Sequence, residues 1–424
     1  MSGHATSGRP AFAALLAAIT LAGLLVRSCG LAGQPPLEDD RAAGVTAANF
    51  VERGHPGPTM WHHPRLRDLL VYATTSALGE TKLGLVLPSL LLGVLSIPII
   101  GLLGRRLAGP AAGTVAAAFV ALDPLHVDYS RQAVQEVYTF FFGAAGVLLA
   151  LRHAKTRRPA WLLASGVTFG LGAAAKWSVL FPMAVTAAWL VVAQLRDREA
   201  SRSATAARIA FTLAALGALP ATVYLLTWTP WFVQGRDLRD WLELQRAMAA
   251  EARIHAGFNA WGLDLPHEAW RWFVLPVAFA DFTFGPAGPI PIVAIANPAV
   301  WLLTLPAVLQ VARRGFRERR PEDALLVALF AGTYLPFLLT SRPIWLHSAL
   351  AVLPFPLIAV AALLVGLQRR GARARLAIGA YAAVVLAVAL PLLALATGRA
   401  MDIGPLRRLA EFYRPAARFE EPPK

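Results

Sequence analysis

Long apolar runs recur along almost the whole chain, and they constrain its fold more than any other feature. A helix that crosses a membrane needs about 20 predominantly apolar residues, with a range of about 17–25. The 424-residue chain is 57% hydrophobic and 15% charged, whereas soluble domains carry about 25% charged residues. The runs with this character lie at 11–30, 83–104, 107–122, 135–151, 160–175, 177–195, 207–228, 294–312, 323–340, 344–367 and 376–397. We therefore predict a single all-α integral membrane domain over residues 1–424, with about eleven transmembrane helices.

Positive charge is concentrated in short loops on one side of this predicted bundle. The formal net charge is +15, and the arginine-rich loops lie at 105–106, 152–158, 196–208, 313–320 and 369–375. Because cytoplasmic loops carry an excess of Lys and Arg, this pattern predicts a cytoplasmic N-terminus in an inner or plasma membrane. The extracytoplasmic side then holds two large loops, 31–82 and 229–293, with amphipathic helices, and a tail at 398–424. Charge divided among loops, instead of along one stripe, argues against a nucleic-acid partner.

Three consecutive acids, Glu38, Asp39 and Asp40, follow the first apolar run in the stretch GQPPLEDDRAAG. The chain has only 25 acidic residues, and the predicted topology places these three outside the cytoplasm, at the membrane surface. Acids in such a loop can simply be solvated and help to fix topology. A carboxylate there can also accept a proton from a substrate hydroxyl, so the cluster is a candidate catalytic base.

Further ionisable residues gather at the same side of the membrane. The stretch LDPLHVDYSRQAVQEVYTFFF carries Asp123, Arg131 and Glu136 between two apolar runs, and Lys176 lies in GAAAKWSVLFP at the outer ends of two others. Arg131 can snorkel, and an acid at a helix start such as Glu136 is favoured by the helix dipole. Ionisable groups at membrane depth are nevertheless costly and are functional candidates by default. Arg131 and Lys176 are suited to hold a phosphate and its developing charge.

Two adjacent histidines, His62 and His63, occur in MWHHPRLRDLL of the first large loop. Neighbouring histidines alone are a weak signal for a metal site, because a zinc site needs three or four ligands. We predict a structural or pocket role for them and no required cofactor. A divalent metal stays open but has no support in the sequence.

These segments, taken in order, resemble the GT-C membrane glycosyltransferases and, within them, the protein O-mannosyltransferase family. LEDDRAAG resembles the acid pair of the first outer loop, HHPRLRDLL the His-Pro motif at His63, and LDPLHVDYSRQAVQE the Leu-Asp…Ser-Arg element. GAAAKWSVLFP is similar to the Lys-Trp-Ser/Thr-Gly element, with Val179 in place of the Gly. WLELQRAMAAEARIHAG resembles a loop helix that ends at His255, PHEAWRWFVLP the Trp-rich stretch after it, and ANPAVWLL a Gly-Asn-Pro…Trp element with Asn297. Glu136 stands where the family usually has Asp.

The resemblance implies a GT-C fold with eleven helices and an inverting transfer of sugar, usually mannose, from a polyprenyl-phosphate donor in the membrane to a protein Ser/Thr hydroxyl outside the cytoplasm. A first-loop carboxylate would be the base, and the family pair matches either Glu38-Asp39 or Asp39-Asp40. Asp39 is favoured because it belongs to both pairings. Arg131 and Lys176 would contact the donor phosphate. The supporting residues would be Glu136, Asp123, His63, His255 and Asn297.

Three alternatives stay open at this point. The same donor type could supply an aminosugar or pentose to a glycolipid acceptor such as lipid A, as in aminoarabinose transferases. A lipid or sugar transporter is an alternative of another class, although it should carry charge midway through its helices and a repeated half-structure. The chain could also be an inactive homologue. The acceptor, the sugar and the oligomeric state are not determined by the sequence.

Overall fold

The computed structural model describes residues 8–58, 61–254, 269–274, 278–285, 288–340, 344 and 346–398. The first half contains α1 (Gly8–Ser28), η1 (Leu31–Gly33), α2 (Glu38–Arg53), α3 (Leu66–Leu78), α4 (Lys82–Ala108), α5 (Pro110–Leu122), α6 (Pro124–Tyr129), α7 (Glu136–Thr156), α8 (Pro159–Ala175), η2 (Trp177–Val179) and α9 (Leu180–Leu195). The second half contains α10 (Arg202–Leu213), η3 (Ala214–Ala218), α11 (Leu219–Leu226), α12 (Thr229–Val233), α13 (Leu238–Ile254), η5 (Ala269–Phe273), β1 (Ala278–Gly285), β2 (Gly288–Ile295), α14 (Pro298–Trp301), α15 (Thr304–Glu318), α16 (Pro321–Leu339), η6 (Leu346–Ala351), α17 (Pro354–Gln368) and α18 (Ala372–Ala396).

Seven helical segments in the described part of the chain are long and apolar enough to cross a membrane. They are Pro10–Gly33, Lys82–Ala108, Glu136–Thr156, Trp177–Leu195, Arg202–Leu226, Pro321–Leu339 and Ala372–Ala396. Three of the predicted runs form shorter apolar helices, α5, α8 and α17. The run predicted at 294–312 is different, because it falls on the end of β2, on α14 and on α15, which ends in the charged sequence RRGFRE.

The predicted all-α class holds for the helical bundle, and the described residues add a short β-hairpin to it. Strands β1 and β2 pair antiparallel, with Ala278 opposite Ile295 and Gly285 opposite Gly288. The sequence AFADFTFGPAGPIPIVAI carries the signals for this hairpin, since aromatic and β-branched residues flank a Gly-Pro-Ala-Gly turn. The described part of the chain is thus predominantly helical, and its hairpin lies in and just beyond the second large loop.

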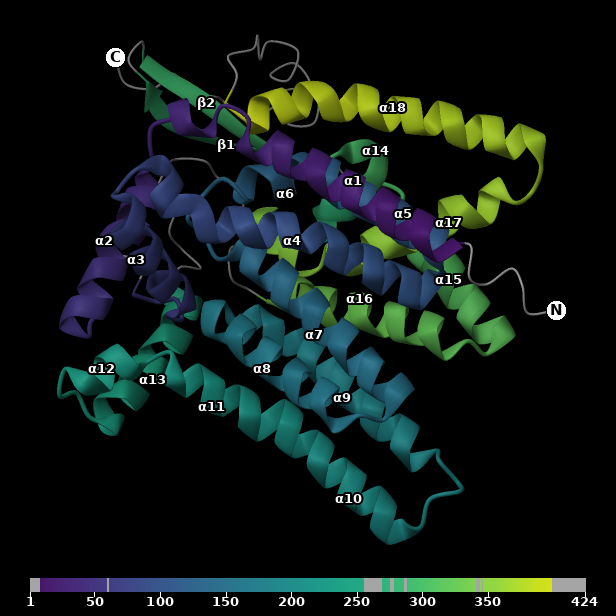
Figure 1. Cartoon of the computed structure of the whole chain (residues 1–424), viewed down its shortest axis with the longest axis horizontal. Coiled ribbons are helices and arrows are strands. Elements are labelled where there is room, and N and C mark those ends of the chain that lie inside the picture. Colours follow the sequence, from purple (N-terminus) through teal and green to yellow (C-terminus); the bar gives the residue numbers. More distant parts are fainter. Residues whose placement is uncertain are drawn as a thin grey trace.

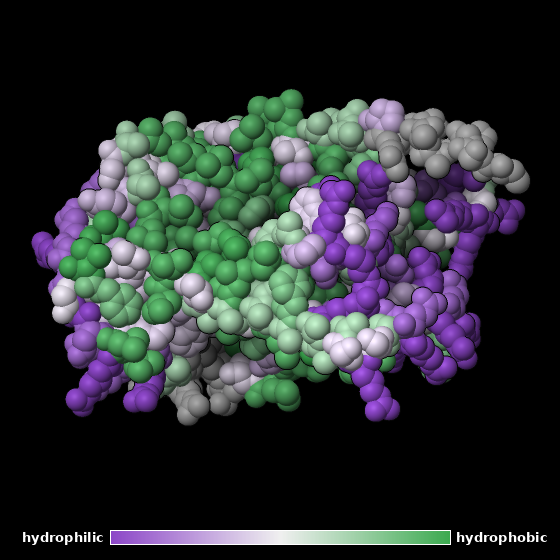
Figure 2. All heavy atoms as spheres, turned by 60° about the horizontal axis from the view of Figure 1, so that its bottom comes forward, coloured by the Kyte–Doolittle hydropathy of each residue, from purple (hydrophilic) through white to green (hydrophobic). Residues whose placement is uncertain are grey.

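The long helices run side by side, and the short elements collect at one end of them (Figure 1). Helices α2, α3, α12 and α13 and the β-hairpin lie at that end. The connections α4–α5, α7–α8, α15–α16 and α17–α18 lie at the opposite end, and these are arginine-rich loops. Figure 2 shows a broad apolar surface between two polar ends of the molecule. Because hydrocarbon covers only the middle of a membrane protein, this distribution is that of an integral membrane protein.

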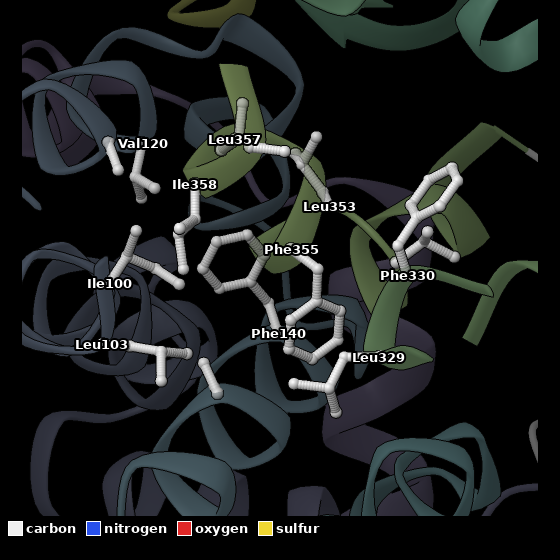
Figure 3. Close-up of a cluster of buried hydrophobic side chains, with 14 of the residues drawn as sticks. Ile100, Leu103, Val120, Phe140, Leu329, Phe330, Leu353, Phe355, Leu357 and Ile358 are labelled. Atoms are coloured by element: carbon white, nitrogen blue, oxygen red, sulfur yellow. The ribbon is translucent and has the colours of Figure 1, made fainter. Parts of the chain in front are cut away.

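Buried side chains from many of the helices form the core of the bundle. Ile100 and Leu103 of α4 face Phe140 of α7, and the side chains of Phe355 and Leu329, from α17 and α16, point into the same cluster (Figure 3). Each of these residues is 0% exposed. Helices α4 and α5 approach each other closely, because small residues line their contact and let the backbones meet. This packing fixes the outer ends of α4 and α7, where the candidate site begins.

Candidate functional site

The three acids of the first loop begin α2, and the structure gives them different surroundings. Asp40 is completely buried. Its Oδ2 accepts the backbone N–H of Leu37 at 2.8 Å and the Lys82 ammonium, and its Oδ1 accepts the N–H of Ala133 at 2.7 Å. These bonds join the start of α2 to the start of α4 and to the loop before α7. Asp40 therefore fixes the start of α2, and both oxygens of its carboxylate accept hydrogen bonds from the protein.

Glu38 and Asp39, in contrast, are exposed in the first turn of α2. The unpaired N–H groups of a helix start favour negative charge there. Among the three acids, these two have carboxylates that a substrate can approach. Of the two pairings that the family resemblance allows, Glu38-Asp39 consists of two exposed acids. Asp39-Asp40 consists of one exposed acid and one buried acid.

A second group of charges surrounds Glu136 at the start of α7. The Lys176 Nζ donates to Glu136 Oε1 at 2.6 Å, and His347 Nε2 lies 3.4 Å from the same oxygen. Tyr129 contacts His347 in turn, with 3.4 Å between the hydroxyl and Nδ1. The Lys176 side chain remains 23% exposed, so an anion can approach it. The structure thus brings together the predicted Glu136 and Lys176, and it adds His347, which the sequence analysis did not single out.

A third group lies just before and within α3, where sequence reasoning expected only a helix on the membrane surface. Arg65, Arg67 and Asp68 are all 0% exposed. Asp68 accepts from Arg65 Nη1 at 2.7 Å and from Arg67 Nη2 at 2.6 Å. The Arg65 guanidinium also lies over the rings of Phe50 and Trp228, at 5.6 and 5.5 Å from their centroids. Two buried guanidinium groups thus lie beside one carboxylate in this part of the site.

His63 lies beside this positive charge. Its ring packs 4.3 Å from that of His62, and its carbonyl oxygen accepts from Arg65 Nη2. Burial, together with the nearby charges of His62, Lys176 and Arg67, holds the pKa of His63 well below its usual 6.5. His63 is consequently neutral at pH 7.

Lowering the pH from 7.5 to 5.5 is expected to destabilise the protein partly through His63. A group with a depressed folded-state pKa contributes its stability above the unfolded-state pKa, near 6.5, and loses it as the pH falls below that value, by at most about 1.4 kcal/mol per pH unit. In His63→Gln the midpoint of thermal unfolding should therefore fall less over this interval than in the native chain. Equal falls in the two proteins would contradict the assignment.

Arg131, predicted to bind the donor phosphate, makes a different set of contacts. Its Nη1 donates to the carbonyl oxygens of Arg27 at 2.5 Å and Cys29 at 2.9 Å. Its Nη2 donates to Gln34 Oε1 at 2.9 Å and to the carbonyl of Thr397 at 3.4 Å. The guanidinium thereby links the end of α1 to the end of α18 through hydrogen bonds. A contact with phosphate stays a prediction for this residue.

Two further predicted residues cap short helices. Asp123 is buried, and its carboxylate accepts the N–H of His126 at 2.9 Å and Trp301 Nε1 at 2.9 Å. Asn297 caps α14 through its Oδ1, and its Nδ2 donates to the carbonyl of Val385 at 3.1 Å. Both side chains hold α6 and α14 in place, which is a positioning role in the bundle.

Two remaining expectations concern a histidine and a metal. His255, predicted as a pocket residue, lies outside the described residues. Within the residues that the structure describes, no group of three or more His, Cys, Asp or Glu side chains is arranged to hold a metal ion.

Known proteins resemble this chain in sequence. Residues 62–228 match the family described as dolichyl-phosphate-mannose-protein mannosyltransferase. The chain is 23% identical over 368 residues to the polyprenol-phosphate-mannose–protein mannosyltransferase of Corynebacterium glutamicum, covering 72% of this chain and 71% of that protein.

Two solved structures share the fold. The S. cerevisiae protein O-mannosyltransferase Pmt1-Pmt2 complex bound to the sugar donor matches with a TM-score of 0.75 at 12% identity, over 95% of this chain and 92% of that one. The Archaeoglobus fulgidus oligosaccharyltransferase AglB matches with a TM-score of 0.59 at 12% identity, over 99% of this chain. This chain spans only 62% of the archaeal one. With the motifs in their order, these similarities indicate a membrane glycosyltransferase that resembles the protein O-mannosyltransferase family and shares the fold of the two solved structures.

Proposed function

We propose that the chain transfers mannose from a polyprenyl-phosphate donor to a Ser or Thr hydroxyl of a protein, with inversion, on the extracytoplasmic side. One observation carries the proposal. The segment from Ala133 to Glu136 joins the two halves of the site, because its first residue binds Asp40, next to Asp39, and its last residue binds Lys176. The start of α2, which carries the exposed Asp39, and the partly exposed Lys176 are thus both held by contacts with one short segment, and such fixed positions suit a base and a phosphate contact.

The reaction follows from these positions. Asp39 accepts the proton of the acceptor hydroxyl while the hydroxyl oxygen attacks the anomeric carbon of the sugar. The bond from that carbon to the phosphate oxygen breaks, and the configuration inverts because the attack is a single displacement. The leaving polyprenyl phosphate takes the electron pair, and Lys176 and the positive group around Arg65 and Arg67 stabilise its charge. A phosphate neutralised in this way leaves without a strong general acid.

We also propose the finer topology predicted from the sequence, with eleven membrane-embedded helical segments in one domain and a cytoplasmic N-terminus. Its support is that the arginine-rich connections lie at the end of the bundle opposite to α2, α3 and α13 (Figure 1). Since arginine-rich loops face the cytoplasm, the site then faces away from it. A cysteine placed in the α2–α3 loop should be labelled by an impermeant thiol reagent in intact cells, whereas one in the α7–α8 loop should not.

A transfer assay tests the function directly. The purified chain in nanodiscs, supplied with labelled polyprenyl-phosphate mannose, should place the label on a Thr-containing peptide. Label on a lipid A-type glycolipid, but not on peptide, would instead support the glycolipid alternative. Movement of labelled donor across a vesicle membrane without any transfer would support a transporter.

Replacing Lys176 by Met is expected to lower kcat/KM for the donor by about tenfold to hundredfold, because a hydrogen bond to a charged group contributes about 1.5–3 kcal/mol. KM for the acceptor peptide should change little. The matched control is Lys155→Met, which removes an exposed lysine at the end of α7 away from the site. Initial rates at varied donor concentration measure both, and indistinguishable rates for the two variants would exclude Lys176 from the donor site.

A further inference from the structure

A pocket of about 460 Å³ lies at the far end of α2 from the three acids. It is lined by His55, Gly57, Pro58, Trp61 and Leu244. Four of these residues belong to the segment between α2 and α3, and Leu244 comes from α13. The lining is mainly apolar, and none of the reactions described above uses it.

One wall of the pocket is preformed by the backbone. The N–H of Gly57 donates to His55 Nδ1 at 3.0 Å, and the His55 ring packs against Trp231. Gly57 has a φ of +82°, and a Cβ at this position would lie 2.9 Å from Asn49 Nδ2. Glycine is therefore required here, both for the left-handed conformation and for the close approach of Asn49. A wall fixed in this way needs little ordering when a ligand binds.

The opposite wall is connected to the donor half of the site. Next to Leu244, Gln245 Oε1 accepts the Tyr224 hydroxyl at 2.6 Å, and Trp177 Nε1 donates to the same Tyr224 oxygen at 3.2 Å. Trp177 directly follows Lys176. The position of α13, and so the width of the pocket, is thus tied to the residue next to the proposed phosphate contact.

The exposed face of α2 connects the pocket with the acids. Glu38, Arg41 and Val45 are exposed, and Asn49 follows at the same helical spacing beside the pocket wall. Residues at this spacing lie on one face of a helix. Asn49 lies ten residues after Asp39, which corresponds to about 15 Å along the helix. An extended polypeptide covers this distance with four or five residues at about 3.3 Å each.

From this arrangement we infer that the pocket is an exosite for the acceptor polypeptide. It takes an apolar side chain that lies four to six residues from the Ser or Thr to be glycosylated, while the intervening residues follow the exposed face of α2. This inference rests on the proposed function for the identity of the substrate. An apolar side chain suits the lining of Trp61, Pro58 and Leu244, and its burial supplies binding energy that does not depend on the reacting centre.

Peptides with one Thr and one Leu in a Gly/Ser background test the inference. The native chain in nanodiscs should show a KM about tenfold lower when the Leu lies four to six residues from the Thr than when it lies at two or ten, with kcat unchanged. Trp61→Ala and Leu244→Ser should remove this dependence on spacing while both variants still glycosylate the Leu-free peptide at the native rate. The matched control is Trp270→Ala, at a tryptophan that is 45% exposed outside the pocket. The exosite would be overturned if the native chain had the same KM for peptides of every Leu–Thr spacing. It would also be overturned if KM still depended on the spacing in both pocket variants.

A binding measurement separates failure of the exosite from failure of the proposed function. A photoreactive leucine in the same peptides should cross-link to His55, Pro58, Trp61 or Leu244 at the optimal spacing, whether or not transfer takes place. Cross-links in the pocket without transfer would retain the exosite and count against the mannosyltransferase assignment. Transfer with cross-links only elsewhere would retain the function and overturn the exosite.

Discussion

Asp39→Asn is expected to reduce mannose transfer to a Thr-containing peptide by about 10²- to 10⁴-fold, the usual contribution of a positioned general base. Asn keeps the size and polarity of the side chain but cannot accept the hydroxyl proton. The loss should fall on kcat, because the carboxylate acts in the transition state and not in holding the donor. The thermal unfolding midpoint should change by little, since Asp39 is exposed in the first turn of α2. Steady-state rates at saturating donor measure the effect.

Glu38→Gln is the matched control for this prediction. Glu38 is the neighbouring exposed acid, so its replacement removes the same charge from the same helix start. If transfer needs the Asp39 carboxylate as a proton acceptor, and not only negative charge at the start of α2, Glu38→Gln should keep most of the activity. A large loss in Glu38→Gln with normal activity in Asp39→Asn would move the base to Glu38.

The sequence could name the three acids but could not assign their roles. Glu38, Asp39 and Asp40 are adjacent carboxylates with similar chemistry, and the family resemblance allows two pairings of them. Asp40 differs from the other two because it binds the ammonium of Lys82, 42 residues later, and the backbone N–H of Ala133, 93 residues later. Contacts of that sequence separation depend on how α2, α4 and α7 pack, which no local pattern encodes.

The membrane helices were easier to predict because their signal is local. An apolar run of about 20 residues has few other structures available to it, and ten of the eleven predicted runs coincide with apolar helices. The interface elements were harder. The sequence RLRDLL of α3 has the composition of a surface helix, yet Arg67 and Asp68 are buried because they neutralise each other and meet Arg65.

Not every ionisable residue at membrane depth has the same surroundings, although the sequence treats all of them as functional candidates. Both Arg131 and Lys176 were assigned to the phosphate because buried cations are costly without a function. The Lys176 ammonium is paired with Glu136 and is still partly exposed, and its contact with the phosphate stays a prediction. Arg131 is instead surrounded mainly by backbone carbonyls at the ends of α1 and α18. Backbone acceptors leave no trace in the sequence, so the two cases could not have been separated without the structure.

Asp40→Asn should lower the free energy of unfolding by about 3–5 kcal/mol, because it leaves the Lys82 ammonium buried without its carboxylate. The side chains of Lys82 and Asp40 are 4% and 0% exposed. Adding Lys82→Met should recover most of this loss, since removing both members of a buried ion pair costs far less than removing one. The half-buried pair Arg106–Glu322, with side chains 31% and 30% exposed, provides the control, and Glu322→Gln should cost no more than about 1 kcal/mol.

The same pair of variants separates an anchoring role from a chemical one. Asp40→Asn should lose transfer because the start of α2 is no longer fixed to Ala133, and the double variant should regain stability together with part of the transfer activity. Unfolding measured in detergent, alongside transfer rates below the unfolding midpoint, provides both values. A variant Asp40→Asn that is as stable as the native chain but has lost transfer completely would show that this carboxylate takes part in the reaction itself. The base would then have to be sought at Asp40, and the exposed position of Asp39 would need another explanation.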